Sequence, residues 1–240
     1  MAADPLSMSI DTGAVIKTIP DDMYGISTDW SVDNNYIVTD YEGGDLSPNE
    51  NFLRAMSEYK LPVVRLGEGA SDTFQWKQAV GPLEQRGDQT LWGQTGKVVA
   101  GPVETINTMQ AIDPDAAFTV TINIETDTAE SAADYAEFLT GDVSTEWGAK
   151  RAENGHPDPV PVKVYEIGNE VDLDSVMTVD EYIAACKEYI AAVKAVDTDA
   201  RFAVHTSTGI YNKYQWDEPG DPWHIDILSD AALAEEIDYI

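Results

Sequence analysis

The residues best suited to chemistry lie in the segment Tyr165-Glu166-Ile167-Gly168-Asn169-Glu170. The apolar stretch before it is typical of a buried strand, and it ends in a glycine, an amide and a carboxylate. A carboxylate there can act as general acid and then as general base, while the amide holds a substrate hydroxyl. Because the same pair also occurs in ordinary exposed loops, the motif alone leaves both interpretations open.

Other candidates also follow predicted strands. Glu125 comes after the strand predicted at 117–124, and His205 lies at the end of the strand predicted at 201–206. Either could face the same site, although a structural role is equally compatible with His205. Aromatic rings in loops could stack on a sugar, with packing in the core as the alternative. These rings belong to Trp76, Trp92 and Trp147.

The histidines and the cysteine give no metal or redox signature. The chain has three histidines, none in an HxH or HExxH arrangement, and one cysteine, Cys186. One cysteine allows neither an internal disulfide nor a cysteine-rich zinc site. No GxGxxG follows the first predicted strand, and no GxSxG occurs. We therefore expect no metal and no other cofactor.

The elements that must position these residues alternate between strands and helices. Strands are predicted at 23–28, 61–66, 117–124, 162–167 and 201–206, with the start of a sixth at 237–240. Helices are predicted between them, near 48–59, 103–112, 127–139, 178–193 and 225–236. This order indicates βαβ units with parallel pairing, as a doubly wound sheet or a (β/α) barrel.

The missing GxGxxG favours the barrel. The predicted fold is α/β of the TIM-barrel type, incomplete, with about five βα units, because a barrel gathers all strand ends at one face. Residues 21–240 would form this partial barrel and residues 1–20 an N-terminal extension. Ser47 as N-cap with Pro48 at N1 predicts the first helix start. The capping box from Thr178 to Glu181 predicts another.

The net charge is the unusual number in the composition. Forty-four acidic residues against fourteen basic ones leave a formal charge of -30. Such a surface repels phosphate backbones and anionic lipid, so we expect neither nucleic acid nor a membrane as partner. The acids are scattered, as on a solvated surface, and a high-salt habitat is the favoured explanation. The N-terminus lacks the features of a signal peptide, which leaves both a cytoplasmic and a secreted location open.

The stretch from Trp147 to Glu170 resembles the segment before the catalytic acid in α-L-arabinofuranosidases of glycoside hydrolase family 51. It reads WGAKRAENGHPDP, a short spacer and VKVYEIGNE. The family pattern is similar to G-x-x-R-A-x-N-G-H-P-x-P, a spacer and V-K-Y-W-E-I-G-N-E. A weaker resemblance runs through Tyr24-Gly25 and residues 62–82. The resemblance implies a retaining glycosidase that acts on plant-type oligosaccharides or polysaccharides, with the sugar and linkage left open.

Site residues follow from the resemblance position by position. Glu170 takes the place of the family's acid/base, and Asn169 that of its substrate-binding amide. Arg65 matches an arginine that pairs with the nucleophile, and Asp29 falls near a glutamate that contacts sugar hydroxyls. The family's Pro-Gly-Gly-Asn turn is replaced here by Gly67-Glu68-Gly69-Ala70, so the asparagine's sugar contact is absent. Trp76, Glu125 and His205 complete the expected substrate-binding set.

The resemblance places the nucleophile after a seventh strand, which this sequence does not contain. Three hypotheses follow: an enzyme whose site is completed by another chain or by an unorthodox second carboxylate, a non-catalytic sugar-binding barrel, or a fragment of a longer hydrolase. Five or six strands leave unpaired edges at 23–28 and 237–240, which favours a two-fold homodimer across the open side. In this interpretation Arg65 lacks its carboxylate partner, and high salt should favour assembly because it screens the repulsion.

Overall fold

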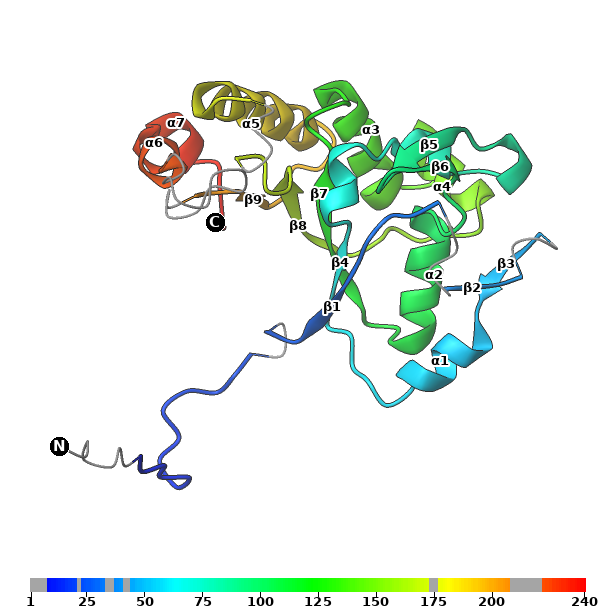
Figure 1. Cartoon of the computed structure of the whole chain (residues 1–240), viewed down its shortest axis with the longest axis horizontal. Helices are drawn as coiled ribbons and strands as arrows, with labels where there is room; N and C mark the ends of the chain where they lie inside the picture. The colour runs from blue at the N-terminus through cyan, green and yellow to red at the C-terminus, as the bar shows by residue number, and fades with distance from the viewer. Residues whose placement is uncertain (1–7, 21–22, 33–36, 41–43, 173–176, 208–221) are drawn as a thin grey trace.

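The centre of the molecule is a parallel sheet with the strand order β1-β4-β7-β8-β9. The computed structural model describes residues 8–20, 23–32, 37–40, 44–172, 177–207 and 222–240 (Figure 1). The five strands are β1 (Gly25–Thr28), β4 (Val63–Leu66), β7 (Ala117–Ile122), β8 (Val162–Ile167) and β9 (Phe202–Val204). Every pairing between neighbours is parallel, which confirms the predicted α/β class.

The sheet is open in the part of the chain that the structure describes. Strands β1 and β9 stand at its two ends and do not pair with each other. Beyond β9, Tyr239 makes a parallel bridge to Ala203, where the sequence predicts a sixth strand to begin. Residues 8–20 carry no helix or strand and lead away from β1 (Figure 1).

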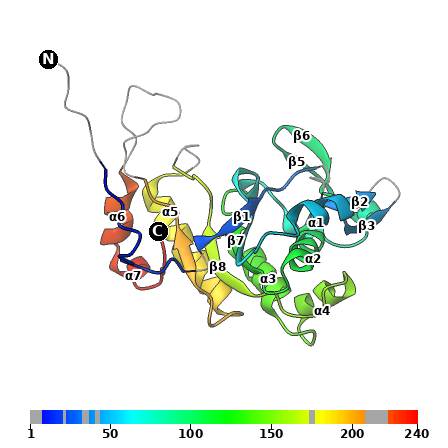
Figure 2. The same cartoon turned by 90° about the horizontal axis from the view of Figure 1, so that it is seen from below.

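Helices connect the strands and cover one face of the sheet. The helices are α1 (Glu50–Met56), α2 (Pro102–Ile112), α3 (Ala129–Thr140), α4 (Glu146–Glu153), α5 (Val179–Lys194), α6 (Trp223–Ser229) and α7 (Ala231–Ala234). Both views place α6 and α7 at the β9 end of the molecule (Figures 1 and 2). Among the described residues, no helix has the length and apolar character needed to span a bilayer.

Alternation along the strands separates two chemically different faces. Successive side chains in a strand point to opposite faces, so every second residue meets the helices. On that face the side chains are buried in one continuous apolar core with those of α2, α3 and α5; they are Val64, Leu66, Phe118, Val120, Ile122, Tyr165, Ile167, Phe202 and Val204. The opposite face carries Arg65, Thr119 and Glu166, which line cavities instead.

Two small hairpins and three short 3-10 helices fill the long connections before β4 and β7. The hairpins are β2 (Val38–Asp40) with β3 (Asp45–Pro48), and β5 (Asp88–Leu91) with β6 (Gln94–Lys97). The 3-10 helices are η2 (Gly69–Asp72), η3 (Trp76–Ala79) and η4 (Leu83–Gln85). The hairpins lie at the end of the molecule opposite α6 and α7 (Figure 2).

The structure corrects the predicted start of α1. The N-cap is Asn49, whose side-chain oxygen accepts hydrogen bonds from the backbone of Asn51 at 2.9 Å and of Phe52 at 3.4 Å. Pro48 does not occupy N1, because it pairs with Val38 across the β2–β3 hairpin. The chain can therefore enter a helical conformation only after Pro48. The predicted cap at Ser47 is wrong.

The predicted helix at 225–236 is two helices that meet at Asp230. Its extended backbone (φ -77°, ψ 98°) ends α6. Its carboxylate then accepts a hydrogen bond from the backbone N–H of Leu233 at 2.9 Å, which caps α7. Lys187 of α5 also pairs with this carboxylate at 2.6 Å. The backbone of Asp230 thus ends α6, while its side chain caps α7 and connects this junction to α5.

A fully buried arginine fixes the segment between α3 and β8. The Arg151 guanidinium donates to the carbonyls of Phe138 at 2.7 Å and Leu139 at 3.0 Å, at the end of α3. It also donates to the carbonyls of His156 at 3.0 Å and Pro157 at 3.1 Å. Buried carbonyls without a donor are costly, so one side chain satisfies the end of α3 and the loop that leads into β8.

His156 lies against this arginine and is itself buried. Its Nδ1 lies 2.8 Å from the Asn107 side-chain oxygen on α2. Burial lowers the pKa of His156, and the positive charge of Arg151 lowers it further, while Asp158 acts in the opposite direction. These contacts anchor the loop between α4 and β8. The neutral imidazole is therefore the form that the native state favours.

We predict that His156→Gln removes a pH-dependent part of the stability. The native pKa lies below the unfolded one, so in acid the unfolded state binds more protons than the native state. The wild-type contribution is present above the unfolded pKa of about 6.5 and is lost as the pH falls towards the native value. The free energies of unfolding of wild type and variant, measured in urea, should therefore converge between pH 7.5 and 5.

Asn154→Ala provides the control, because Asn154 lies in the same loop and donates to the Lys150 carbonyl at 2.7 Å without titrating. Its difference from wild type should stay constant with pH. A His156→Gln difference that also stays constant would contradict the assignment of a neutral native histidine.

Candidate active site at the carboxyl ends of the strands

Three neighbouring strands bring an ion pair and an amide together on the face of the sheet that points away from the helices, here called the inner face. Arg65 on β4 donates through Nε to Glu166 on β8 at 2.6 Å. Thr121 on β7 donates to the same carboxylate oxygen at 2.8 Å. The Arg65 Nη2 also donates to the Asn169 side-chain oxygen at 3.1 Å. The guanidinium therefore fixes both Glu166 and the amide that the sequence singles out.

The expectation that Arg65 has no carboxylate partner is wrong. Glu166 supplies that partner from within the chain, with the Arg65 and Glu166 side chains 30% and 23% exposed. The alternation along β8 could have indicated this partner. Glu166 lies between Tyr165 and Ile167, both of which are buried against the helices. Alternation then directs Glu166 to the inner face, where an isolated charge needs a partner.

Glu170 lies in a tight loop directly after β8. Gly168 has φ +76°, and Glu170 itself has φ +46°, in the left-handed region that residues with a side chain rarely adopt. A Cβ on Gly168 would come within 2.6 Å of Val171, so only glycine fits there. The Asn169 backbone N–H donates to the Asp72 carboxylate at 3.2 Å. This strained backbone is held by its surroundings.

A cavity of about 540 Å³ opens at this edge of the sheet. Its wall includes Arg65, Glu166, Asn169, Glu170 and His205. Four of these were expected in the site from the sequence, and the structure brings them to one place. His205 also forms an ion pair with Asp172 when its ring is protonated. The cavity combines carboxylates, an amide and an arginine, groups that can hydrogen-bond sugar hydroxyls and exchange protons.

Asp29, which directly follows β1, is not among the residues that line this cavity. One carboxylate oxygen accepts from the backbone N–H groups of Trp30 at 2.8 Å and Ala70 at 3.3 Å. The other accepts from the Trp92 indole N–H at 2.7 Å. Asp29 therefore ties the end of β1 to the loop after β4 and to the β5–β6 hairpin.

Trp92 has an exposed ring. The sequence alone did not distinguish it from Trp76 and Trp147 as a ring that could stack on a sugar. It occupies the tip of the β5–β6 hairpin with φ +51°, and 66% of the residue is exposed. Its indole lies over Gly69, where an added Cβ would approach it to 2.6 Å. The hydrogen bond to Asp29 holds the ring at the same end of the sheet. An exposed, fixed aromatic face is suited to stacking against a sugar.

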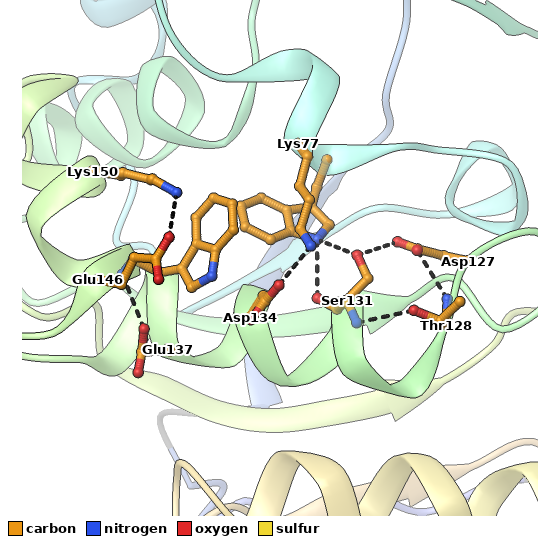
Figure 3. A network of polar contacts seen from close by, with 10 residues as sticks. Lys77, Asp127, Thr128, Ser131, Asp134, Glu137, Glu146 and Lys150 are labelled. Atoms are coloured by element: carbon orange, nitrogen blue, oxygen red, sulfur yellow. Dashed lines mark hydrogen bonds and ion pairs between the residues drawn. The ribbon is translucent and has the colours of Figure 1, made fainter.

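The structure corrects the expected role of Trp76. Its ring is buried in the core, and its indole N–H donates to the backbone and hydroxyl oxygens of Ser131, both at 3.1 Å. The Trp147 ring packs edge-on against the Trp76 ring, with 4.9 Å between the ring centroids. Figure 3 shows the polar contacts around the two rings, including the Lys77–Asp134 ion pair at 2.5 Å. No free face remains for a substrate, so Trp76 supports α3 instead.

Glu125 also lies outside the cavity wall. It follows β7 at the same end of the sheet and is half-buried. Its backbone N–H donates to the Asn123 side-chain oxygen at 3.0 Å, as part of a turn. Among the described residues, no three histidine, cysteine, aspartate or glutamate side chains are grouped so that they could hold a metal ion.

A comparison with models of protein families shows to which family the chain belongs. Residues 56–224 match the model of the Alpha-L-arabinofuranosidase 1 domain, and this span covers well over half of the sequence and includes Arg65, Asn169, Glu170 and His205. The chain belongs to this family. The arabinofuranosidase domain thus includes the carboxyl ends of β4, β7, β8 and β9, where the cavity lies.

Individual arabinofuranosidases agree in sequence and in fold. A probable alpha-L-arabinofuranosidase C of Aspergillus fumigatus is 28% identical over 165 residues, which is 65% of this chain and 32% of that protein. An extracellular exo-alpha-L-arabinofuranosidase of Streptomyces chartreusis is 30% identical over 145 residues, 51% of this chain and 16% of that protein. The alpha-L-arabinofuranosidase structure from Thermotoga maritima, an arabinose complex, superposes with a TM-score of 0.73 at 27% identity.

The arabinofuranosidase domain is shorter than these proteins. The Thermotoga maritima superposition covers 90% of this chain and 44% of that one. The chain spans about a third of the length of the Aspergillus fumigatus relative.

We predict that Glu166→Gln lowers the free energy of unfolding by about 1 kcal/mol, because it removes a charged acceptor that serves both Arg65 and Thr121. The partial exposure of the pair keeps the loss modest. Urea unfolding measures it. Glu146→Gln is the control, since its i,i+4 pair with Lys150 at 2.9 Å is exposed and contributes less. Equal losses in the two variants would contradict a structural role of Arg65–Glu166.

Proposed function

We propose that this chain carries the acid/base part of a retaining α-L-arabinofuranosidase site for plant-type oligosaccharides or polysaccharides. The observation that carries the proposal is the placement of Glu170, next to Asn169, in the wall of the cavity that Arg65 and Glu166 also line. Membership of the arabinofuranosidase family supports the substrate class. The open parallel sheet is then an arc of a (β/α) barrel, whose active sites lie at the carboxyl ends of the strands.

Glu170 has two roles in this mechanism. As an acid it protonates the glycosidic oxygen while the leaving group departs, and as a base it then takes a proton from the water that releases the sugar. Asn169, oriented by Arg65 and Asp72, donates its amide N–H groups to a sugar hydroxyl. The exposed Trp92, held by Asp29 after β1, offers a stacking surface at the same end of the sheet.

A retaining mechanism also needs a second carboxylate about 5–5.5 Å from the first. Glu166 lies in the cavity, but Arg65 and Thr121 both donate to one of its oxygens. That engagement fits an orienting role better than a nucleophile. We therefore place the nucleophile on strands that complete the barrel beside β1 and β9, contributed by another chain or by a longer form of this protein.

A non-catalytic sugar-binding barrel is the second candidate. The features that favour it are the fixed Asn169 amide and the exposed Trp92 ring, which bind sugar without any nucleophile. Both candidates predict arabinose binding at the cavity, and only the first predicts turnover of an aryl α-L-arabinofuranoside.

We predict that Glu170→Gln lowers kcat on an aryl α-L-arabinofuranoside by about 10²–10⁴-fold, because the proton donor is lost while the shape of the side chain is kept. The effect should be smallest for the best leaving group, which needs least protonation. Release of the aryl group measures it, and ¹H NMR of the first product gives the stereochemistry. Glu130→Gln, on the exposed start of α3, should leave turnover unchanged. Full activity of Glu170→Gln would exclude it as the acid/base.

We also predict that high salt promotes self-association of this chain. Two copies that close the open edges at β1 and at the segment around Tyr239 each carry a formal charge of -30, so their repulsion must be screened first. Sedimentation velocity from 0.1 to 3 M NaCl should show a growing dimer fraction, with arabinofuranosidase activity rising in parallel. A monomer at every salt concentration, with full activity, would exclude closure by a second copy.

A further inference from the structure

The loop that carries Glu170 is connected to β9 through His205. The His205 ring nitrogen Nε2 pairs with the Asp172 carboxylate, two residues after Glu170. The His205 backbone N–H donates to the Tyr182 hydroxyl at 2.8 Å, and that hydroxyl donates to the Ile167 carbonyl at 2.7 Å. One histidine thus connects the end of β9 with the residues on both sides of the Glu170 loop.

The loop is held from two sides, and Glu170 lies between them. Before Glu170, Asn169 is fixed by Arg65 at 3.1 Å through its side chain and by Asp72 at 3.2 Å through its backbone N–H. After Glu170, Asp172 is fixed by His205. A non-glycine residue with φ +46° is in a disfavoured conformation, which persists where the surrounding structure holds it. The His205–Asp172 contact supplies the second restraint.

This contact is sheltered enough to act as a restraint. The Asp172 side chain is 9% exposed and the His205 side chain 24%. A partly desolvated, hydrogen-bonded pair is stronger than the exposed pairs on the surface, which contribute little. His205 also belongs to the residues that line the cavity, so the restraint acts at the site itself.

From these contacts we infer that His205 is a positioning residue for Glu170. By holding Asp172 through Nε2, it keeps the Glu170 backbone left-handed and its carboxyl group directed at the cavity. The effect on turnover rests on the proposed acid/base role of Glu170, whereas the effect on the backbone does not. The role is assigned to one atom, which allows a matched set of substitutions.

Two substitutions by amide residues distinguish the roles of the two ring nitrogens of His205. In His205→Gln the side-chain N–H₂ can take the place of Nε2 and reach Asp172. In His205→Asn the amide takes the place of Nδ1 and is too short to reach it. His205→Ala removes both. Asp172→Ala removes the acceptor, and the double variant His205→Ala with Asp172→Ala should cost no more than either single one.

The first readout is the intraresidue HN–Hα nuclear Overhauser effect of Glu170, which is strong when φ is positive and weak when it is negative. We expect it to be strong in wild type and in His205→Gln, and weak in His205→Asn, His205→Ala and Asp172→Ala. Thermal melting identifies any variant that fails to fold, and the remaining variants still decide the question. A strong signal in His205→Ala, or a signal in His205→Gln as weak as in His205→Ala, would overturn the inference.

The second readout is turnover of an aryl α-L-arabinofuranoside by the same variants. Misplacement of an acid/base lowers kcat more than KM, and we expect about a tenfold loss of kcat in His205→Ala that His205→Gln largely restores. If the wild-type chain shows no turnover at any salt concentration, completion of the active site by a second copy fails, while the nuclear Overhauser effects still test His205. If wild type turns over and His205→Ala matches it in both readouts, His205 has no positioning role and the proposed function stands.

Discussion

The candidate site depends on the parallel register of β4, β7 and β8. Arg65 is level with Thr119, and Thr121 is level with Glu166, so side chains from three strands meet on one face. Arg65 and Glu166 are separated by 101 positions in the sequence and by 2.6 Å in space. A shift of one residue in β4 would turn Arg65 into the apolar layer under the helices and leave Glu166 without its cation. The apolar core therefore sets the geometry of the polar site.

The elements that the sequence predicted well are those whose local signals agree with their packing. Strand β8 coincides with the predicted span 162–167, and α5 begins at the capping box of Thr178. The start of α1 was misplaced because Pro48 pairs with Val38, a contact that no local pattern reveals. The strands of the β5–β6 hairpin, with the sequences DQTL and QTGK, are short and mostly polar, and each contains a single β-branched residue. Hydrophobic periodicity therefore did not predict them.

The site was predictable where a residue ends a strand, and unpredictable where its environment comes from elsewhere. Asn169 and Glu170 follow from the motif, because a strand end in a parallel sheet faces the same edge as its neighbours. Trp76 and Trp92 lie in the same connection between β4 and α2, yet one is buried under α3 and the other is exposed. Their different fates depend on Ser131 and Asp29, which lie 55 and 63 residues away.

Charge explains how so acidic a protein keeps a site built from carboxylates. Around the Glu170 loop Glu166 contacts Arg65 and Asp172 contacts His205. Asp72 accepts a hydrogen bond from the backbone N–H of Asn169. The Glu166 and Asp172 side chains are only 23% and 9% exposed in these contacts, whereas most of the acidic residues are scattered along the chain. Salt screens separated, exposed charges far more strongly than sheltered pairs in contact. Concentrated ions can therefore relieve the repulsion across the surface and leave the pairs that shape the loop intact.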